Sequence, residues 1–213
     1  ETSTTNCSVS LSFENDLVDC IEQDSSNYSH SENLHVFIKE LLNKNNTEFN
    51  QLSAISVSRG PGSYTGLRIG LSAAKGLCYG LDIPLISISS LKILANSVKF
   101  DGFTVATMDA RRDEVYSCIY DPNLNVIREE KPEIIYHESF KDISENNKLL
   151  FIGDGQFKCK ELINTNDNFS FESSILRPTS KNMIDLAFDK LKNNDFEDLA
   201  YFEPKYLKEF RSN

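Results

Sequence analysis

The sequence predicts an α/β fold in which one arrangement of elements is used twice. Short apolar runs, typical of buried strands, alternate with longer stretches in which apolar residues recur every three or four positions, as in helices. The order strand, strand, strand, helix, strand, helix occurs in the first half of the chain and again in the second. We therefore expect two subdomains with mixed sheets, residues 1–100 and 101–213, with the last helix or the tail packing back on the first.

Residues 55–95 form the centre of the first half. An apolar run at 52–57 predicts a buried strand, and the stretch 59–63, which contains Gly and Pro, then interrupts the pattern. Helical periodicity follows at 66–79, and a second apolar run at 85–88 predicts the next strand. The stretch is therefore a strand, a glycine-rich loop, a helix and a strand in succession.

The helix expected at 66–79 has its own end signals and an unusual composition. Ser63 or Thr65 can cap its N-terminus, and residues 80–82 can end it. Glycine or alanine occupies positions 66, 70, 73, 74 and 76. Because each helical glycine costs about 0.5–1 kcal/mol relative to alanine, we expect this helix to pack closely against another element, of this chain or of a partner.

The other elements follow from the same patterns. In the first half we expect strands at 7–13 and 17–21, and a helix at 32–44 that begins with a capping box formed by Ser29 and Glu32. In the second half we expect strands at 103–108, 114–120, 126–136 and 149–152. We expect helices near 139–145 and at 156–163, and a last helix that begins after a cap at Thr179 or Ser180. Most of 197–213 is expected to be loop.

Composition and charge limit the classes of function. The chain has 213 residues, of which 39% are hydrophobic and 25% charged, as in globular proteins. No apolar run approaches the roughly 18 residues of a membrane span. The net charge is −10, and Arg111-Arg112 is the nearest approach to a basic run. Since nucleic-acid binding depends on Lys and Arg contacts to phosphates, we expect this chain not to hold a nucleic acid by itself.

The cysteines indicate a reducing compartment. There are five of them, widely spaced and without a C-x-x-C pair. An odd number at such spacing favours free buried thiols over a disulfide framework. We therefore expect a cytoplasmic protein.

Several motifs in this chain resemble one known family. SRGPGSYTGLRIGLSAAKGL begins at Ser58 and is followed by PLISISSL; ETSTTNCSV, MDARRDEVY and the weaker segments FIGDG and PKYLK agree with it. On these residues the chain resembles the TsaB (YeaZ) family, whose members are partners of TsaD in making the threonylcarbamoyl modification of adenosine 37 of tRNA. The resemblance covers nearly the whole chain and implies a duplicated actin/Hsp70/sugar-kinase-like (ASKHA) fold.

The resemblance also bears on the N-terminal strands. The sequence does not begin with Met. By resemblance, a few residues of a first strand precede Glu1. Together with the strands at 7–13 and 17–21, that strand would complete a three-stranded meander.

The resemblance further implies that the chemistry of TsaD is missing here. In TsaD a metal is held by an H-x-x-x-H helix, whose two histidine positions fall on Ser90 and Leu94 of this chain. Neither residue is a useful metal ligand. An acidic pair in the opening of TsaD falls on Thr5 and Asn6. We therefore expect no metal site and no catalytic residue in this chain.

The residues themselves allow two interpretations of the loop at 60–66. Glycine-rich turns that precede helices can bind phosphate. GPGSYTG, however, has the spacing GxGxxxG, one residue longer than the dinucleotide motif, and no GK[ST] follows it. We favour a tight turn from strand to helix.

The isolated polar residues do not form a recognisable catalytic set. His30 and His35 are five positions apart and diverge around a helix, and His137 stands alone. The serine of GPGSYTG lacks the G-x-S-x-G spacing of a nucleophile. Asp109 and Asp154 each follow a strand, and we interpret both as turn residues that bond to the backbone.

The expected function is that of a non-catalytic scaffold or activator in bacterial tRNA threonylcarbamoyladenosine (t6A) synthesis. The chain would bind a TsaD-like threonylcarbamoyltransferase through the helices at 32–44 and 66–79, because the first has a broad apolar face and the second is rich in small residues. The residues assigned to this surface are His30, Leu34, Phe37, Ile38, Leu41, Tyr64, Leu67, Gly70, Leu71 and Ala74.

Further partners are implied by the resemblance. A TsaE-like ATPase would be a third component, and tRNA would be contacted only through the complex. When the partner is absent, the same apolar surface would pair with itself in a homodimer, since exposed patches of that size seldom stay free.

The alternative is a small ATP-dependent phosphotransferase or ATPase of the same fold that acts alone. It needs carboxylates to hold Mg²⁺ against phosphates. Glu1, Asp109 and Asp154 are the acids placed for this. The residues expected nearest to a nucleotide are Ser3, Thr4, Asp109 and Asp154. We expect no cofactor belonging to this chain, and ATP or ADP at the interface of the complex. A peptidase, a third idea, has no support in the residues.

Overall fold

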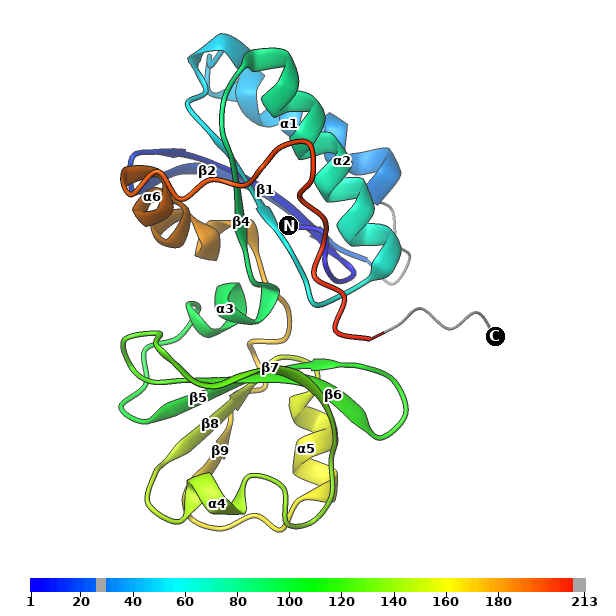
Figure 1. Ribbon diagram of the computed structural model, residues 1–213, viewed down its shortest axis with the longest axis vertical. Helices are drawn as coiled ribbons and strands as arrows, with labels where there is room; N and C mark the ends of the chain where they lie inside the picture. The colour runs from blue at the N-terminus through cyan, green and yellow to red at the C-terminus, as the bar shows by residue number, and fades with distance from the viewer. Residues whose placement is uncertain (26–29, 209–213) are drawn as a thin grey trace. The chain divides into compact units, whose positions relative to one another are not determined.

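The computed structural model describes residues 1–25 and 30–208 (Figure 1). The chain forms two compact units. The first unit comprises Glu1–Ile93 and Pro178–Lys205, and the second comprises Leu94–Arg177 and, among the described residues, 206–208. The expected division at residue 100 therefore lies at residue 93, and the last helix, whose packing the sequence left open, belongs to the first unit. Ser29 of the expected capping box lies outside the described residues.

The first unit contains two short sheets and their covering helices. Its elements are strands β1 (Asn6–Phe13), β2 (Asp16–Asp24), β3 (Ile55–Ser58) and β4 (Leu85–Ile88), and helices α1 (His30–Lys44), α2 (Tyr64–Leu81), α3 (Ser90–Ala95, which crosses into the second unit) and α6 (Ile184–Lys192), with 3₁₀ turns at Phe49–Gln51 and Ser180–Met183. β1 and β2 are antiparallel, and β3 and β4 are parallel. The sequence predicted all four strands, with boundaries that shift by up to three residues.

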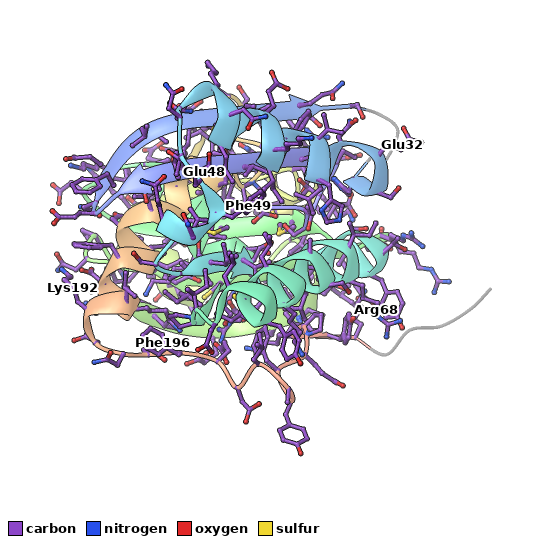
Figure 2. The ribbon with its side chains drawn as sticks, turned by 90° about the horizontal axis from the view of Figure 1, so that it is seen from above. Glu32, Glu48, Phe49, Arg68, Lys192 and Phe196 are labelled. Atoms are coloured by element: carbon purple, nitrogen blue, oxygen red, sulfur yellow. The ribbon has the colours of Figure 1, made fainter. Side chains whose placement is uncertain are left out.

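Helices α1 and α2 lie side by side on this unit and begin at the same end of it, as the positions of Glu32 and Arg68 show (Figure 2). Leu34 of α1 and Ala73 of α2 share a buried cluster with Cys7 of β1. Leu71 of α2 packs in a second cluster with Val57 of β3. The apolar stripes of both helices therefore serve the core of their own unit.

Helix α2 begins and ends where the sequence signals predict. The Ser63 hydroxyl accepts a hydrogen bond from the Gly66 N–H at 3.2 Å, so Ser63 and not Thr65 is the cap. Asp82 ends the helix in the left-handed conformation, with φ of 55°. A short polar side chain tolerates this conformation better than most residues do.

The close packing expected for α2 is made with the N-terminal segment of this chain. A Cβ atom at Gly62, Gly66 or Gly70 would lie within 3.0 Å of Ser3 or Thr2, closer than real Cβ contacts occur. The Thr2 hydroxyl also donates to the Gly66 carbonyl at 2.8 Å. The three glycines, spaced four apart, thus let the backbone at residues 2–3 lie directly on the start of α2.

The two sheets of the first unit are separate in the described residues. β1 pairs with β2 alone and β3 with β4 alone. Residues 1–5 form no strand, and the third strand of the meander, expected ahead of Glu1, stays a prediction. A cavity of about 670 Å³ lies between β1 and β3.

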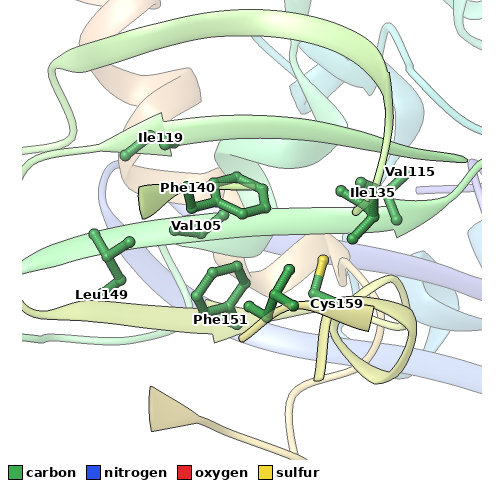
Figure 3. Close-up of a cluster of buried hydrophobic side chains, with 9 residues drawn as sticks. Val105, Val115, Ile119, Ile135, Phe140, Leu149, Phe151 and Cys159 are labelled. Carbon is green, nitrogen blue, oxygen red and sulfur yellow. The ribbon is translucent and has the colours of Figure 1, made fainter. Parts of the chain in front are cut away.

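The second unit is built on one mixed sheet. Its strands are β5 (Phe103–Asp109), β6 (Glu114–Tyr120), β7 (Val126–Ile134), β8 (Leu149–Ile152) and β9 (Phe169–Phe171), in the order β7-β6-β5-β8-β9, with helices α4 (Lys141–Ser144) and α5 (Gln156–Leu162). Strand β9 has three residues, too few for a periodic pattern in the sequence to predict it. Phe151 lies at the centre of the core and contacts Phe140 edge-on at 5.1 Å between ring centroids (Figure 3).

The prediction that Thr179 or Ser180 caps the last helix is wrong. Thr179 occupies the position before the 3₁₀ turn, but its hydroxyl donates to Glu22 of β2 at 2.6 Å instead of capping. Helix α6 follows the turn at Ile184. The tail then returns along the first unit, where the Lys205 N–H donates to the Arg59 carbonyl at 2.7 Å.

We predict opposite effects for the same substitution at two positions of α2. Gly66→Ala should destabilise the protein by roughly 1–3 kcal/mol, because the new methyl group collides with the Thr2 backbone. Gly76→Ala, where no atom lies within 4 Å of the added Cβ, should stabilise it by about 0.5–1 kcal/mol. Urea unfolding of both variants measures this. Equal shifts would show that residues 2–3 do not pack on α2.

Candidate partner-binding surface on helices α1 and α2

A shallow groove runs between the outer faces of α1 and α2. It has a volume of about 720 Å³. Its lining residues are Ser31, His35, Tyr64, Thr65, Arg68, Ile69, Ser72, Ala73, Gly76 and Leu77. The α2 side includes the small residues Ser72, Ala73 and Gly76, and Gly76 has open space where its side chain would be. Small residues on an exposed helix face allow the backbone of another helix to approach closely.

The rim of the groove carries the residue types that anchor protein interfaces. The Arg68 guanidinium lies over the Tyr64 ring, 4.0 Å from its centroid. Tyr and Arg are enriched at energetically important interface positions. Val36 and Tyr79 are also exposed on these two helices. The outer face of the helix pair therefore suits a protein partner.

Most of the residues that the sequence assigned to this surface lie inside the unit. Leu34, Leu41, Leu67, Leu71 and Ala74 are buried by their own chain, His30 is buried at the start of α1 against Thr4, and Gly70 is buried against Thr2. Phe37 and Ile38 are half-buried against the core, and Tyr64 is the one of the ten that lines the groove. Apart from Tyr64, these residues are corrected to core positions, because the apolar stripe of each helix packs on the strands of its own unit.

A different signal in the sequence marks the exposed face. Ser72 and Gly76 are four positions apart, on the side of α2 opposite the buried Leu67 and Leu71. A glycine in the middle of a helix lowers helix stability. Where that glycine makes no close contact within its own chain, it is a stronger sign of an external contact than a row of leucines is. Gly76 meets that description, whereas Gly66 and Gly70 do not.

The glycine-rich loop is committed to contacts within this unit. The Arg59 N–H donates to Ile88, and the Ser63 N–H donates to the Ser3 carbonyl at 2.7 Å. The Gly60 carbonyl accepts from Ser90 at 3.0 Å. Anion binding needs loop N–H groups that point at the ligand. Two of these N–H groups are already bonded, which favours the tight-turn interpretation.

Ser3 and Thr4 lie beside this loop and are both buried. The Ser3 N–H donates to the Glu1 carboxylate at 2.6 Å. The Thr4 hydroxyl accepts from the Asn6 N–H at 3.2 Å, and the Thr4 carbonyl lies 2.7 Å from the His30 ring. These contacts fix the N-terminal segment on α1 and α2, which is a structural role.

Asp109 and Asp154 come together at the ends of β5 and β8 in the second unit. The Asp154 carboxylate accepts from the Asp109 N–H at 2.8 Å. The Asp109 carboxylate accepts from the Arg111 N–H at 2.6 Å and from the Lys158 ammonium at 3.0 Å. Burial raises the pKa of the Asp154 carboxyl above its ordinary value, and the hydrogen bond from the Asp109 N–H acts in the opposite direction. Both carboxylates therefore hold the β5–β6 turn, as the turn interpretation predicts.

The positions of the TsaD metal ligands do not fit a metal here. Ser90 and Leu94 lie on α3 and are fully buried. A hydrocarbon side chain cannot bind a metal, and a lone hydroxyl is a poor ligand. In residues 1–25 and 30–208, no cluster of three or more His, Cys, Asp or Glu residues could hold a metal ion. Thr5 and Asn6 stand at the positions of the TsaD acidic pair. The Thr5 hydroxyl donates to the Asp24 carboxylate, and the Asn6 side-chain amide donates to the Pro178 carbonyl.

The buried cysteines are poor nucleophiles. Burial raises the pKa of Cys78 to about 11 and that of Cys159 to about 12. A reactive cysteine needs a lowered pKa, because the thiolate is the attacking species. All five cysteines are free thiols.

Comparison with known proteins identifies the family. The model of the family "TsaD: tRNA N6-adenosine threonylcarbamoyltransferase" matches residues 24–212. The chain belongs to this family. Within it, the chain is 29% identical over 189 residues to the TsaB protein of Escherichia coli, covering 84% of this chain and 80% of that protein. The TsaB protein of Bacillus subtilis is 35% identical over 139 residues, covering 63% of this chain and 61% of that protein.

These relatives confirm the resemblance to the TsaB (YeaZ) family. A tRNA N6-adenosine threonylcarbamoyltransferase of Clostridioides difficile is also similar, 41% identical over 63 residues, but the match spans 30% of this chain and 19% of that protein. The structure titled "YeaZ from Pseudomonas aeruginosa" matches with a TM-score of 0.84 at 24% identity, covering 97% of this chain and 96% of that one. The likeness confirms the actin-like fold. In the described part of the chain, no helix is long and apolar enough to cross a membrane.

We predict that acid weakens the packing of the N-terminal segment through His30. Burial lowers the pKa of this imidazole below its ordinary value, so the folded state favours the neutral ring. The stability that this provides is complete above the unfolded pKa of about 6.5 and is lost as the pH falls through the lower folded pKa. Chemical unfolding at several pH values should show a loss of stability below pH 6.5 that His30→Gln reduces. Parallel pH profiles for both proteins would refute this role.

Proposed function

We propose that this chain is an accessory subunit of tRNA threonylcarbamoyladenosine synthesis that binds a TsaD-like threonylcarbamoyltransferase and supplies no catalytic group. The observation that carries the proposal is the groove on α1 and α2, whose lining has the small residues and the Arg68–Tyr64 pair of a helix-binding surface. The relatives support the pathway, since they are named tRNA threonylcarbamoyladenosine biosynthesis protein TsaB.

The groove favours a helix as the docking element. Ser72 and Gly76 present little side-chain volume, so a helix of the partner can lie across α2 at close range. Ile69 and Leu77 provide apolar contacts along the same face. A stable complex buries on the order of 1,200–2,000 Å² in total, so the interface would extend beyond the groove to neighbours such as Tyr79.

The absence of chemistry follows from the residues at the TsaD metal positions. Ser90 and Leu94 cannot replace two histidines, and the carboxylates of Asp109 and Asp154 are engaged in the β5–β6 turn. With a net charge of −10 the chain would also repel the tRNA backbone. The catalytic metal, the substrate and the tRNA would therefore all be bound by the partner.

Other components are part of the same proposal. A TsaE-like ATPase would join the complex, and ATP or ADP would be bound at the interface of the subunits. In the absence of TsaD, the exposed groove would pair with that of a second copy, because a face of this kind is more stable when covered. The complex would work in the cytoplasm.

We predict that Ser72→Glu weakens binding of the TsaD-like protein from the same organism at least tenfold, a loss of about 1.4 kcal/mol, because it places a charge in the groove. Asn43→Glu adds the same charge to an exposed position of α1 outside the groove and should leave binding unchanged. Titration calorimetry measures both affinities, and circular dichroism checks folding. Equal affinities for the two variants would remove the groove from the interface.

The buried face gives a second comparison. Leu67→Glu puts a carboxylate into the core of the first unit and should lower the melting temperature or unfold the protein. A Leu67→Glu variant that folds normally and loses only its partner would contradict the placement of Leu67 in the core.

The alternative, a small phosphotransferase or ATPase acting alone, makes a different prediction. It requires that the purified chain hydrolyse ATP and that Asp109→Asn abolish the turnover. Our proposal predicts no turnover above that of a buffer control, with or without the substitution. Turnover that depends on Asp109 would replace the accessory role with an enzymatic one.

A further inference from the structure

The turn between β5 and β6 in the second unit places two arginines on an unfavourable backbone. Arg111 has a φ of 68° and Arg112 has a φ of 52°. Both angles lie in the left-handed region, which glycine accepts freely and a residue with a long side chain does not. Backbone hydrogen bonds close the turn, from the Ala110 N–H to the Glu114 carbonyl at 3.1 Å and from the Glu114 N–H to the Arg111 carbonyl at 3.2 Å. Two arginines therefore occupy positions that glycine would fill with less strain.

The two guanidinium groups have no partner in the described part of the chain. Both arginines are exposed. Within residues 1–25 and 30–208, neither guanidinium takes part in a hydrogen bond or an ion pair. The backbone of Arg111 does serve the turn, but any residue would supply the same N–H and carbonyl. Strained backbone conformations are retained mainly where they have a function, so the arginine side chains point to an external contact.

The acids on either side of the turn are already paired with lysines. The Asp109 carboxylate pairs with Lys158 at 3.0 Å, and the Glu114 carboxylate pairs with Lys208. Asp113 is the one acid inside the turn, so the two arginines leave a local excess of positive charge. The whole chain has a net charge of −10. The turn is therefore a basic spot on an acidic protein.

Two exposed apolar side chains lie beside this turn. Ile134 of β7 stands opposite Glu114 of β6, and the next residue, Ile135, donates its N–H to the Asp113 carbonyl at 2.9 Å. Ile134 is 62% exposed and Tyr136 is 57% exposed. We call Arg111, Arg112, Ile134 and Tyr136 the arginine patch.

We propose that the arginine patch binds an acidic segment of a protein other than the partner of the groove on α1 and α2. The segment places carboxylates against the two arginines and an apolar side chain against Ile134 and Tyr136. A guanidinium group matches a carboxylate with two parallel hydrogen bonds. Arginine and tyrosine are also the residue types that most often anchor protein interfaces. This inference does not rest on the proposed function.

The composition of the patch favours a protein over a nucleic acid. Phosphates would also bind arginine, but nucleic-acid sites combine extended basic surface with aromatic side chains on which bases stack. Ile134 offers no stacking surface, and the residue before it, Glu133, is an acid that pairs with Arg128 at 2.5 Å. An apolar side chain beside two carboxylates meets all four residues of the patch. Binding of RNA is therefore an outcome that the test must separate.

The test uses an acidic peptide of four Asp-Glu-Leu repeats as the probe. The isotope-labelled chain is titrated with it at low salt and followed by NMR. The amides of Arg111, Arg112 and Tyr136 should shift, with a Kd on the order of 100 µM, as expected for a small contact. Added salt should weaken binding, because exposed charges are screened. An uncharged peptide of four Asn-Gln-Leu repeats should bind at least about tenfold more weakly.

Two double variants separate the patch from the overall charge. Arg111→Glu with Arg112→Glu should weaken binding of the acidic peptide at least about tenfold. Lys99→Glu with Lys148→Glu lowers the net charge equally at exposed lysines of the same unit, near the opposite end of β5, where the Lys148 carbonyl accepts from the Phe103 N–H at 2.8 Å. This control should weaken binding by no more than about twofold, since distant exposed charges contribute little.

A third double variant separates binding from folding. Arg111→Gly with Arg112→Gly relieves the left-handed strain, so the melting temperature should rise by about 2–4 °C. Binding of the acidic peptide should fall at least about tenfold in the same protein. A lower melting temperature would show that the arginines serve the fold, and would overturn the inference.

Three further results would overturn the inference. One is equal affinity for the acidic and the uncharged peptide. Another is an equal loss of binding in the arginine and the lysine variants, which would mean that only the overall charge matters. The third is tighter binding of an oligouridylate than of the acidic peptide, with shifts at Arg111 and Arg112, which would make the patch an RNA contact.

Discussion

The first unit depends on the contact between the backbone of residues 2–3 and the start of α2. Gly62, Gly66 and Gly70 remove the side chains that would prevent it. The contact fixes the N-terminal segment, and that segment bonds in turn to His30 at the beginning of α1. Both helices of the candidate partner surface are therefore positioned by one close approach, which tolerates no side chain at these glycines.

In the proposed role, the two helices would divide their faces between stability and recognition. Leu34 and Leu71 are buried against β1 and β3, and Ser72 and Gly76 remain outside. A substitution on the inner face would change stability first, and a substitution on the outer face would change binding first. In the proposed role, the same two helices would cover the core of the first unit on one side and offer a surface to a partner on the other.

The sequence predicts strands and helix caps better than it predicts which face of a helix is buried in the core of its own chain. The strand at Leu85–Ile88 and the cap at Ser63 follow from apolar runs and from hydroxyl chemistry, and both are found where expected. The assignment of Leu67 to a partner surface was wrong, because periodicity shows that a face is apolar but not what covers it. Gly66 and Gly76 are the same residue type with opposite surroundings, and the contact with Thr2 that distinguishes them spans more than sixty positions of sequence.

Hydrogen exchange of this chain, alone and with the TsaD-like protein of its own organism, tests the central claim most directly. If the outer face of α1 and α2 binds the partner, amides in Tyr64–Leu81 and in the first turns of His30–Lys44 exchange more slowly in the complex, and the β5–β6 turn does not change. Protection confined to the second unit, or no protection at concentrations well above micromolar, would contradict the account.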